Sequence, residues 1–80
     1  MKAEKLLALF EVLAEKMKIN IVQGKGDFHG GLCSVNDESY IVLNKIKPID
    51  QRLNILAKEF GKLDTQNIFI QPVLRAYIEN

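Results

Sequence analysis

The sequence has no tryptophan and only one cysteine, one histidine and two prolines among its 80 residues. A single cysteine cannot form a disulfide within the chain, so nothing points to an oxidising compartment and a cytoplasmic location is expected. No apolar run is long enough to cross a bilayer, and no membrane association is expected. Acidic residues interrupt the N-terminal apolar stretch, which argues against a signal peptide; they are Glu4, Glu11 and Glu15.

Neither sign of charge dominates. The 11 Lys and Arg residues and the 10 Asp and Glu residues leave a net charge of +1, whereas a protein that binds nucleic acid by bulk charge has a clear basic excess. With 48% hydrophobic residues the chain is too apolar to be disordered. We expect one small domain over residues 1–80. Because a domain of this size buries only about 60% of its unfolded surface, we expect it to gain stability as a homo-oligomer or on a protein partner.

Two segments repeat apolar residues at helical spacing and therefore predict long helices. The first covers about residues 2–18, and its apolar face consists of Leu6, Leu9, Phe10, Leu13 and Met17, widened by Leu7, Val12 and Ala14. The second runs from Pro48 to Leu63, with a face of Ile49, Leu53, Leu56, Phe60 and Leu63. A short third helix is predicted over Pro72–Glu79, with an inward face of Val73, Ala76 and Tyr77.

Between the two long helices, three segments rich in β-branched and aromatic residues predict strands, at Ile19–Val22, Leu32–Val35 and Ser39–Leu43. Asn36 and Asp37 tolerate positive φ and predict a hairpin between the last two. We expect a three-stranded antiparallel sheet covered by the two long helices, which is an α+β fold in two layers. The apolar segment Ile68–Ile70 either extends the sheet or packs against the core.

The Gly24–Gly31 segment holds four of the five glycines. A phosphate-binding loop leads into a helix N-terminus, where backbone amides converge on the anion. This segment leads into a predicted strand instead, and it lacks the dinucleotide-binding glycine spacing. We therefore interpret it as a flexible connection between strands, without a nucleotide site.

His29 and Cys33 lie four residues apart and leave an enzymatic alternative open. They could form a Cys–His nucleophile pair, or a metal site together with a carboxylate such as Asp27. A zinc site needs three or four ligands, so carboxylates or a second chain would have to complete it. The simpler interpretation is a loop histidine and an inert strand cysteine. We therefore assign no catalytic, cofactor or metal residue.

Basic residues gather around the second long helix, at Lys45, Lys47, Arg52, Lys58 and Lys62. This Lys45–Lys62 face could bind an anion or nucleic acid weakly. Glu59 and Asp64 lie among these residues and reduce the positive field. A solvated helical face is the favoured interpretation.

One stretch resembles a known family. The tetrapeptide Ile41-Val42-Leu43-Asn44, then Arg52, then Leu56–Lys62 resemble the core of the ImmA/IrrE-type zinc metallopeptidases. In that family a strand of the type I-V-x-N is followed by an arginine and by a helix carrying L-A-H-E-[LF]-G-H. The resemblance covers about residues 1–65 and implies the order helix, three-stranded sheet, active-site helix. The family's two histidines bind zinc, and its glutamate is the general base for the metal-bound water.

The departures from the family pattern bear on function. Lys58 and Lys62 stand where the family has its histidines, and an ammonium group with a pKa of about 10.4 offers no lone pair to zinc at neutral pH. Glu59 matches the general base, and we expect it to pair with Lys62 or Arg52 instead. The family's third ligand lies on a later helix, past Asn80. We therefore expect a non-catalytic, metal-free relative of a zincin core that acts through protein–protein contact or as a dimer, using its first helix and the segment Ile68–Tyr77.

Overall fold

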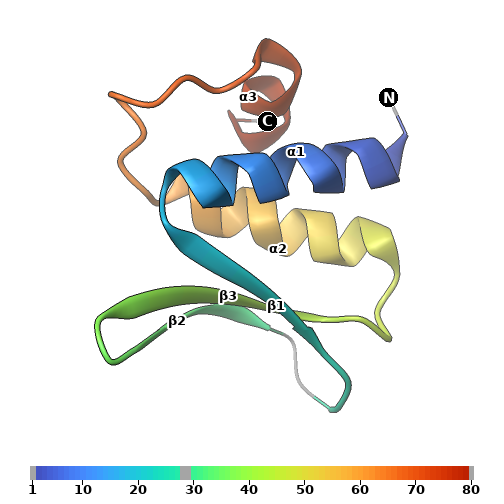
Figure 1. Cartoon of the computed structure of the whole chain (residues 1–80). Coiled ribbons are helices and arrows are strands. Elements are labelled where there is room, and N and C mark those ends of the chain that lie inside the picture. Colours follow the sequence, from blue (N-terminus) through green and yellow to red (C-terminus); the bar gives the residue numbers. More distant parts are fainter. Residues whose placement is uncertain (1, 28–29, 80) are drawn as a thin grey trace.

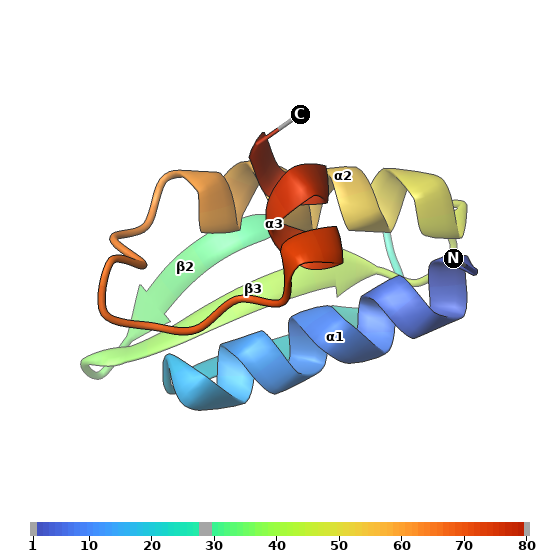
Figure 2. The same cartoon turned by 90° about the horizontal axis from the view of Figure 1, so that it is seen from above.

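The computed structural model describes residues 2–27 and 30–79 of the chain. Its elements follow in the order α1 (Ala3–Lys16), β1 (Ile19–Gly24), β2 (Gly31–Val35), β3 (Glu38–Asn44), α2 (Ile49–Gly61) and α3 (Pro72–Glu79). Helices α1 and α2 lie side by side over one face of the sheet, and α3 crosses above them (Figures 1 and 2). The predicted α+β class and the order of its elements are confirmed.

The sheet is mixed, so the prediction of a purely antiparallel sheet was wrong. Its strand order is β1-β3-β2. β2 and β3 pair antiparallel through a tight turn in which Asn36 and Asp37 have φ of 51° and 68°, as predicted. β1 pairs with β3 in parallel, with Ile21 opposite Ile41. β1 and β2 run in opposite directions but do not pair with each other, because β3 lies between them. β3 is antiparallel to β2 and therefore parallel to β1.

The core lies between the two long helices and the inner face of the sheet. Ile41 and Leu43 of β3 are fully buried against the apolar face of α2. Phe10 of α1 is also fully buried; its ring stacks on Phe60 of α2 with centroids 5.6 Å apart and meets Tyr77 of α3 edge-on at 6.1 Å. Phe10 therefore connects all three helices.

The predicted inward face of α3 was largely wrong. Leu74 is its buried residue, while Val73 is 40% exposed and Ala76 is exposed; only Tyr77 contacts the core as predicted. The chain enters α3 from Ile70, which is itself buried, and this anchor sets which side of the helix faces inward. A helix of eight residues has about two turns, too few for periodicity to fix its orientation.

Two further apolar residues lie outside the core. Val12 of α1, predicted to widen the buried face, is 50% exposed, and Phe69 is 68% exposed. The segment Ile68–Ile70 forms no strand. It packs against the core through Ile70, which was one of the two outcomes left open by the sequence.

Replacing Phe10 tests the contact among the three helices. Phe10→Ala is expected to lower the free energy of unfolding by about 3–5 kcal/mol, because it removes a fully buried ring and leaves a cavity. Urea denaturation followed by circular dichroism measures the change. Ile46→Ala, at a site that is 61% exposed, is the control and is expected to cost at most about 0.5 kcal/mol. Equal losses in both variants would contradict the assignment of Phe10 to the core.

Candidate functional site

The α2 residues matched to the metallopeptidase motif lie beside the start of β2. Lys58 and Glu59 line a shallow cavity of about 360 Å³, which Gly30 and Gly31 close from the other side. Lys58 and Lys62 are exposed to solvent, whereas Glu59 is half-buried. Nζ of Lys62 lies 3.5 Å from Oε1 of Glu59, which confirms the predicted ion pair between these two residues.

This cavity has the chemistry of a polar binding surface. Its polar groups are the ammonium of Lys58, the carboxylate of Glu59 and the amides of Gln51 and Asn54. Among the described residues that line it, none is a histidine, cysteine or serine of the kind that forms nucleophile–base pairs. Over residues 2–27 and 30–79, no group of three His, Cys, Asp or Glu side chains lies close enough together to hold a metal ion.

Asn44 holds the glycine-rich loop to the turn before α2. Its side chain is fully buried; Nδ2 donates to the carbonyl oxygen of Gly26 at 2.7 Å, and Oδ1 accepts from the backbone N–H of Ile46 at 3.2 Å. A backbone hydrogen bond of 2.9 Å from Lys45 to Gly24 closes the same junction. Buried amides of this kind need such partners. The sequence marked Asn44 only through the family resemblance, because no periodic pattern identifies a buried polar residue.

Gly30 explains part of the glycine content of the loop. It has a φ of +96°, and a Cβ at this position would collide with the carbonyl oxygen of Val42. Glycine is the residue that meets both conditions. The loop then enters β2, a strand, as predicted.

Cys33 lies on the edge strand β2 and is exposed. Its register partner on β3 is Tyr40, on the sheet face turned away from the helices. His29 lies outside the described residues, so the predicted alternative of a Cys–His pair stays untested. Because an exposed thiol is accessible to reagents, reactivity of Cys33 alone does not distinguish an enzyme from a binding domain.

The predicted Lys45–Lys62 face is divided in the structure. Arg52 points toward the sheet, and its guanidinium donates a 2.9 Å hydrogen bond to the side-chain oxygen of Gln23 on β1. Lys62 is paired with Glu59, and Lys45 lies exposed in the turn before α2. Because these positive charges do not lie together, the electrostatic potential that would attract a polyanion such as a nucleic acid is weakened.

An exposed apolar surface lies across α1, the segment before α3, and α3. Val12, Phe69 and Val73 are 50%, 68% and 40% exposed, and we call these three residues the Phe69 surface. Val12 and Phe69 line one shallow depression whose floor includes Leu74, the neighbour of Val73. Figure 2 shows the start of α3 lying next to α1, with the rest of α3 running toward α2. Val12 and Phe69 therefore form a small apolar patch on the surface.

Lys16 holds the ring of Phe69 from one side. Its Nζ lies 5.4 Å from the ring centroid, which is within the range of a cation–π interaction. This contact orients an aromatic side chain that is otherwise in solvent.

No family model matches the chain, and neither a curated protein nor a solved structure matches it. The resemblance to the ImmA/IrrE-type metallopeptidases therefore stays a prediction from sequence. In the part of the chain that the structure describes, no helix has the length and apolar character needed to cross a membrane.

The role of Asn44 can be tested by removing its side chain. Asn44→Ala is expected to lower the free energy of unfolding by about 2–3 kcal/mol, because the hydrogen bonds to Gly26 and Ile46 are lost in a buried setting. Hydrogen exchange at Lys45 and Ile46 should accelerate. The matched control is Asn20→Ala, which removes an exposed 3.5 Å hydrogen bond and should cost at most about 0.5 kcal/mol. If both variants lose the same stability, Asn44 does not anchor the loop.

The hydrogen bond between Tyr40 and Glu38, on the outer face of the sheet, can be tested by titration. The Tyr40 hydroxyl donates a 2.7 Å hydrogen bond to Oε2 of Glu38; this bond, and then the negative charge of that carboxylate, raise the pKa of Tyr40 above its usual value of about 10. Because the folded pKa exceeds the unfolded one, the interaction stabilises the fold below about pH 10, and this stabilisation is lost as the pH rises through the folded pKa. Absorbance titration of tyrosinate in a Tyr77→Phe background should show a lower pKa for Tyr40 after Glu38→Gln. An unchanged pKa would be inconsistent with the contact.

Proposed function

We propose that this protein is a non-catalytic domain that acts by binding a second copy of itself through the Phe69 surface. The observation that carries the proposal is the exposure of Phe69, an aromatic residue that is 68% in solvent and lines one depression together with the exposed Val12. Aromatic residues of this kind dominate the binding free energy of protein interfaces. Burying a Val or Phe side chain fully is worth about 1.5–3 kcal/mol.

The charges around the Phe69 surface favour a second copy over a nucleic acid. Lys16 lines the depression beside Phe69, and the exposed acids Glu11 and Glu15 lie further round α1, on the side next to β1. In a dimer with two-fold symmetry the same surface meets itself, so one that carries both signs can pair acids with bases across the axis. With a net charge of only +1, two copies repel each other little.

The size of the chain supports the same proposal. An 80-residue domain has a small core, and contact with a partner would remove from water the apolar side chains that the core does not cover. The predicted contact elements were the first helix and the segment Ile68–Tyr77, and Val12, Phe69 and Val73 all belong to them.

The proposal includes that this protein is a relative of the zinc metallopeptidase (zincin) core that binds no metal and has no catalytic activity. Lys58 and Lys62 replace the two zinc-binding histidines of the resembling family, and the neighbouring Glu59 is engaged with Lys62. Without two histidines to hold zinc, Glu59 would have no metal-bound water to deprotonate. We place the protein in the cytoplasm, on the ground that its single cysteine indicates no oxidising compartment.

Light scattering coupled to size exclusion tests the proposed dimer. At tens of micromolar, the wild-type chain is expected at twice its 9.1 kDa mass. Phe69→Ser should weaken the association by at least about tenfold, because it removes the central apolar contact. Ile46→Ser is the matched control: it removes an apolar side chain of similar exposure, 61%, from the turn before α2 and should leave the dimer intact.

Two results would overturn the proposal. One is a wild-type mass of a single chain throughout this concentration range. The other is equal loss of the dimer in Phe69→Ser and Ile46→Ser, which would show association through general surface hydrophobicity. Circular dichroism of both variants establishes that each remains folded.

A further inference from the structure

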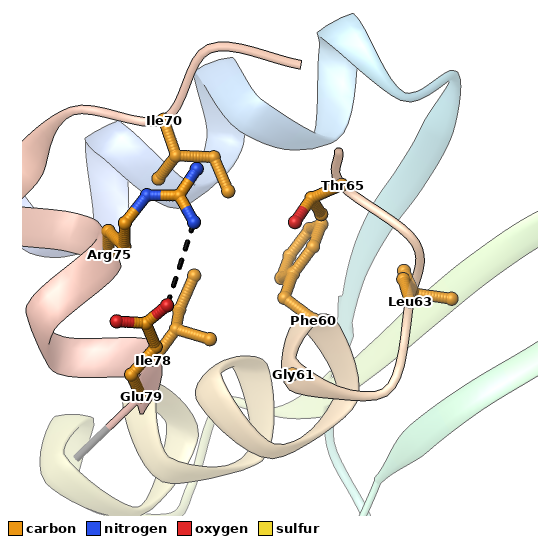
Figure 3. A pocket seen from close by; sticks show the side chains of 8 residues that line it. All are labelled: Phe60, Gly61, Leu63, Thr65, Ile70, Arg75, Ile78 and Glu79. Carbon is orange, nitrogen blue, oxygen red and sulfur yellow. Dashed lines mark ion pairs between the residues drawn. The ribbon is translucent and has the colours of Figure 1, made fainter. Parts of the chain in front are cut away.

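A separate cavity lies between the C-terminal end of α2, the segment 62–71 and α3 (Figure 3). Its volume is about 150 Å³. Phe60 and Ile70, both buried, and the half-buried Ile78 supply apolar walls. A space of about 150 Å³ has room for a molecule of the size of benzene.

Two polar side chains face each other across this cavity. In Figure 3 the guanidinium of Arg75 extends from α3 over one side, and Thr65 stands on the opposite side. One guanidinium nitrogen, Nη1, lies 3.6 Å from Oε2 of Glu79, one turn further along α3. The two side chains are 44% and 64% exposed. An exposed pair at this spacing contributes little stability, so Glu79 is easily displaced from Arg75.

The geometry points to a binding site for a small monocarboxylate whose hydrocarbon part is about as large as a benzene ring. The hydrocarbon packs on Phe60, Ile70 and Ile78 inside the cavity. The carboxylate lies at the mouth, where Arg75 donates two parallel hydrogen bonds and the Thr65 hydroxyl donates a third. Glu79 turns to solvent when the ligand's carboxylate takes its place.

Glu79 also limits the charge of the ligand. Its carboxylate lines the same cavity as Arg75 and is paired with it. A ligand with a single negative charge takes the place of this carboxylate at Arg75, whereas the second charge of a dianion would find no further cation among the lining residues that the structure describes. This site is distinct from the Phe69 surface and does not rest on the proposed dimer.

Titration of the full-length ¹⁵N-labelled chain with benzoate tests the site. Saturable amide shifts are expected at Gly61, Thr65 and Ile78, with a dissociation constant in the millimolar range. Arg75→Gln should weaken benzoate binding by about tenfold, through loss of the charge-assisted pair, and Glu79→Gln should tighten it. Benzyl alcohol, which keeps the ring and lacks the charge, should bind the wild type and Arg75→Gln equally.

Lys45→Gln is the control, because it makes the same change in net charge at an exposed site in the turn before α2. It should leave benzoate affinity unchanged. The absence of saturable shifts around the cavity would overturn the inference, as would equal weakening in Arg75→Gln and Lys45→Gln. Repeating the titration on Phe69→Ser separates the two proposals, since benzoate should bind this variant whatever its oligomeric state.

Discussion

The arrangement of the three helices depends on the contact that Phe10 makes with Phe60 and Tyr77. Phe10 is completely buried, and its ring touches one aromatic residue from each of the other two helices. Through Phe60 it fixes α1 against α2, whose apolar face also packs on the sheet. Through Tyr77 it holds α3 across the pair. In the segment before α3, Ile70 is buried and its neighbour Phe69 lies in solvent. Both proposed binding regions border the helix α3 that this aromatic cluster holds in place.

Much of this fold could be predicted from the sequence, for reasons that also explain the errors. Helices α1 and α2 have 14 and 13 residues, long enough for apolar spacing to fix both their type and most of their buried face. Alternation along β1 identifies a strand but carries no information on its direction, so its parallel pairing with β3 could not be predicted. The orientation of α3 is set by the buried Ile70, a tertiary contact. The excess of apolar residues that led to the Phe69 surface is visible in the sequence, whereas the cavity under Arg75 is not, because it depends on the path of the segment 62–71.

The functional residues lie on three separate regions of the molecule. The Phe69 surface spans α1 and α3, the Arg75 cavity opens between α2 and α3, and Lys58 and Glu59 line the groove between α2 and β2. The first two regions are neighbours, since Ile70 lines both depressions. The groove at Lys58 lies where the family resemblance implies an active site. Asn44 matches the asparagine of the family's I-V-x-N strand. In the structure it anchors the loop that borders this groove.

Intermolecular nuclear Overhauser effects test the central claim most directly. A sample that mixes isotope-labelled and unlabelled chains reports only contacts between different copies. If the protein acts through the Phe69 surface, the ring protons of Phe69 will show such effects to the methyl groups of Val12 or Val73 of the other copy. Effects confined to Val22 and Val35, the exposed valines of the sheet, would contradict the claim by placing the contact on the opposite side of the molecule. The absence of any effect in a concentrated sample would contradict self-association itself.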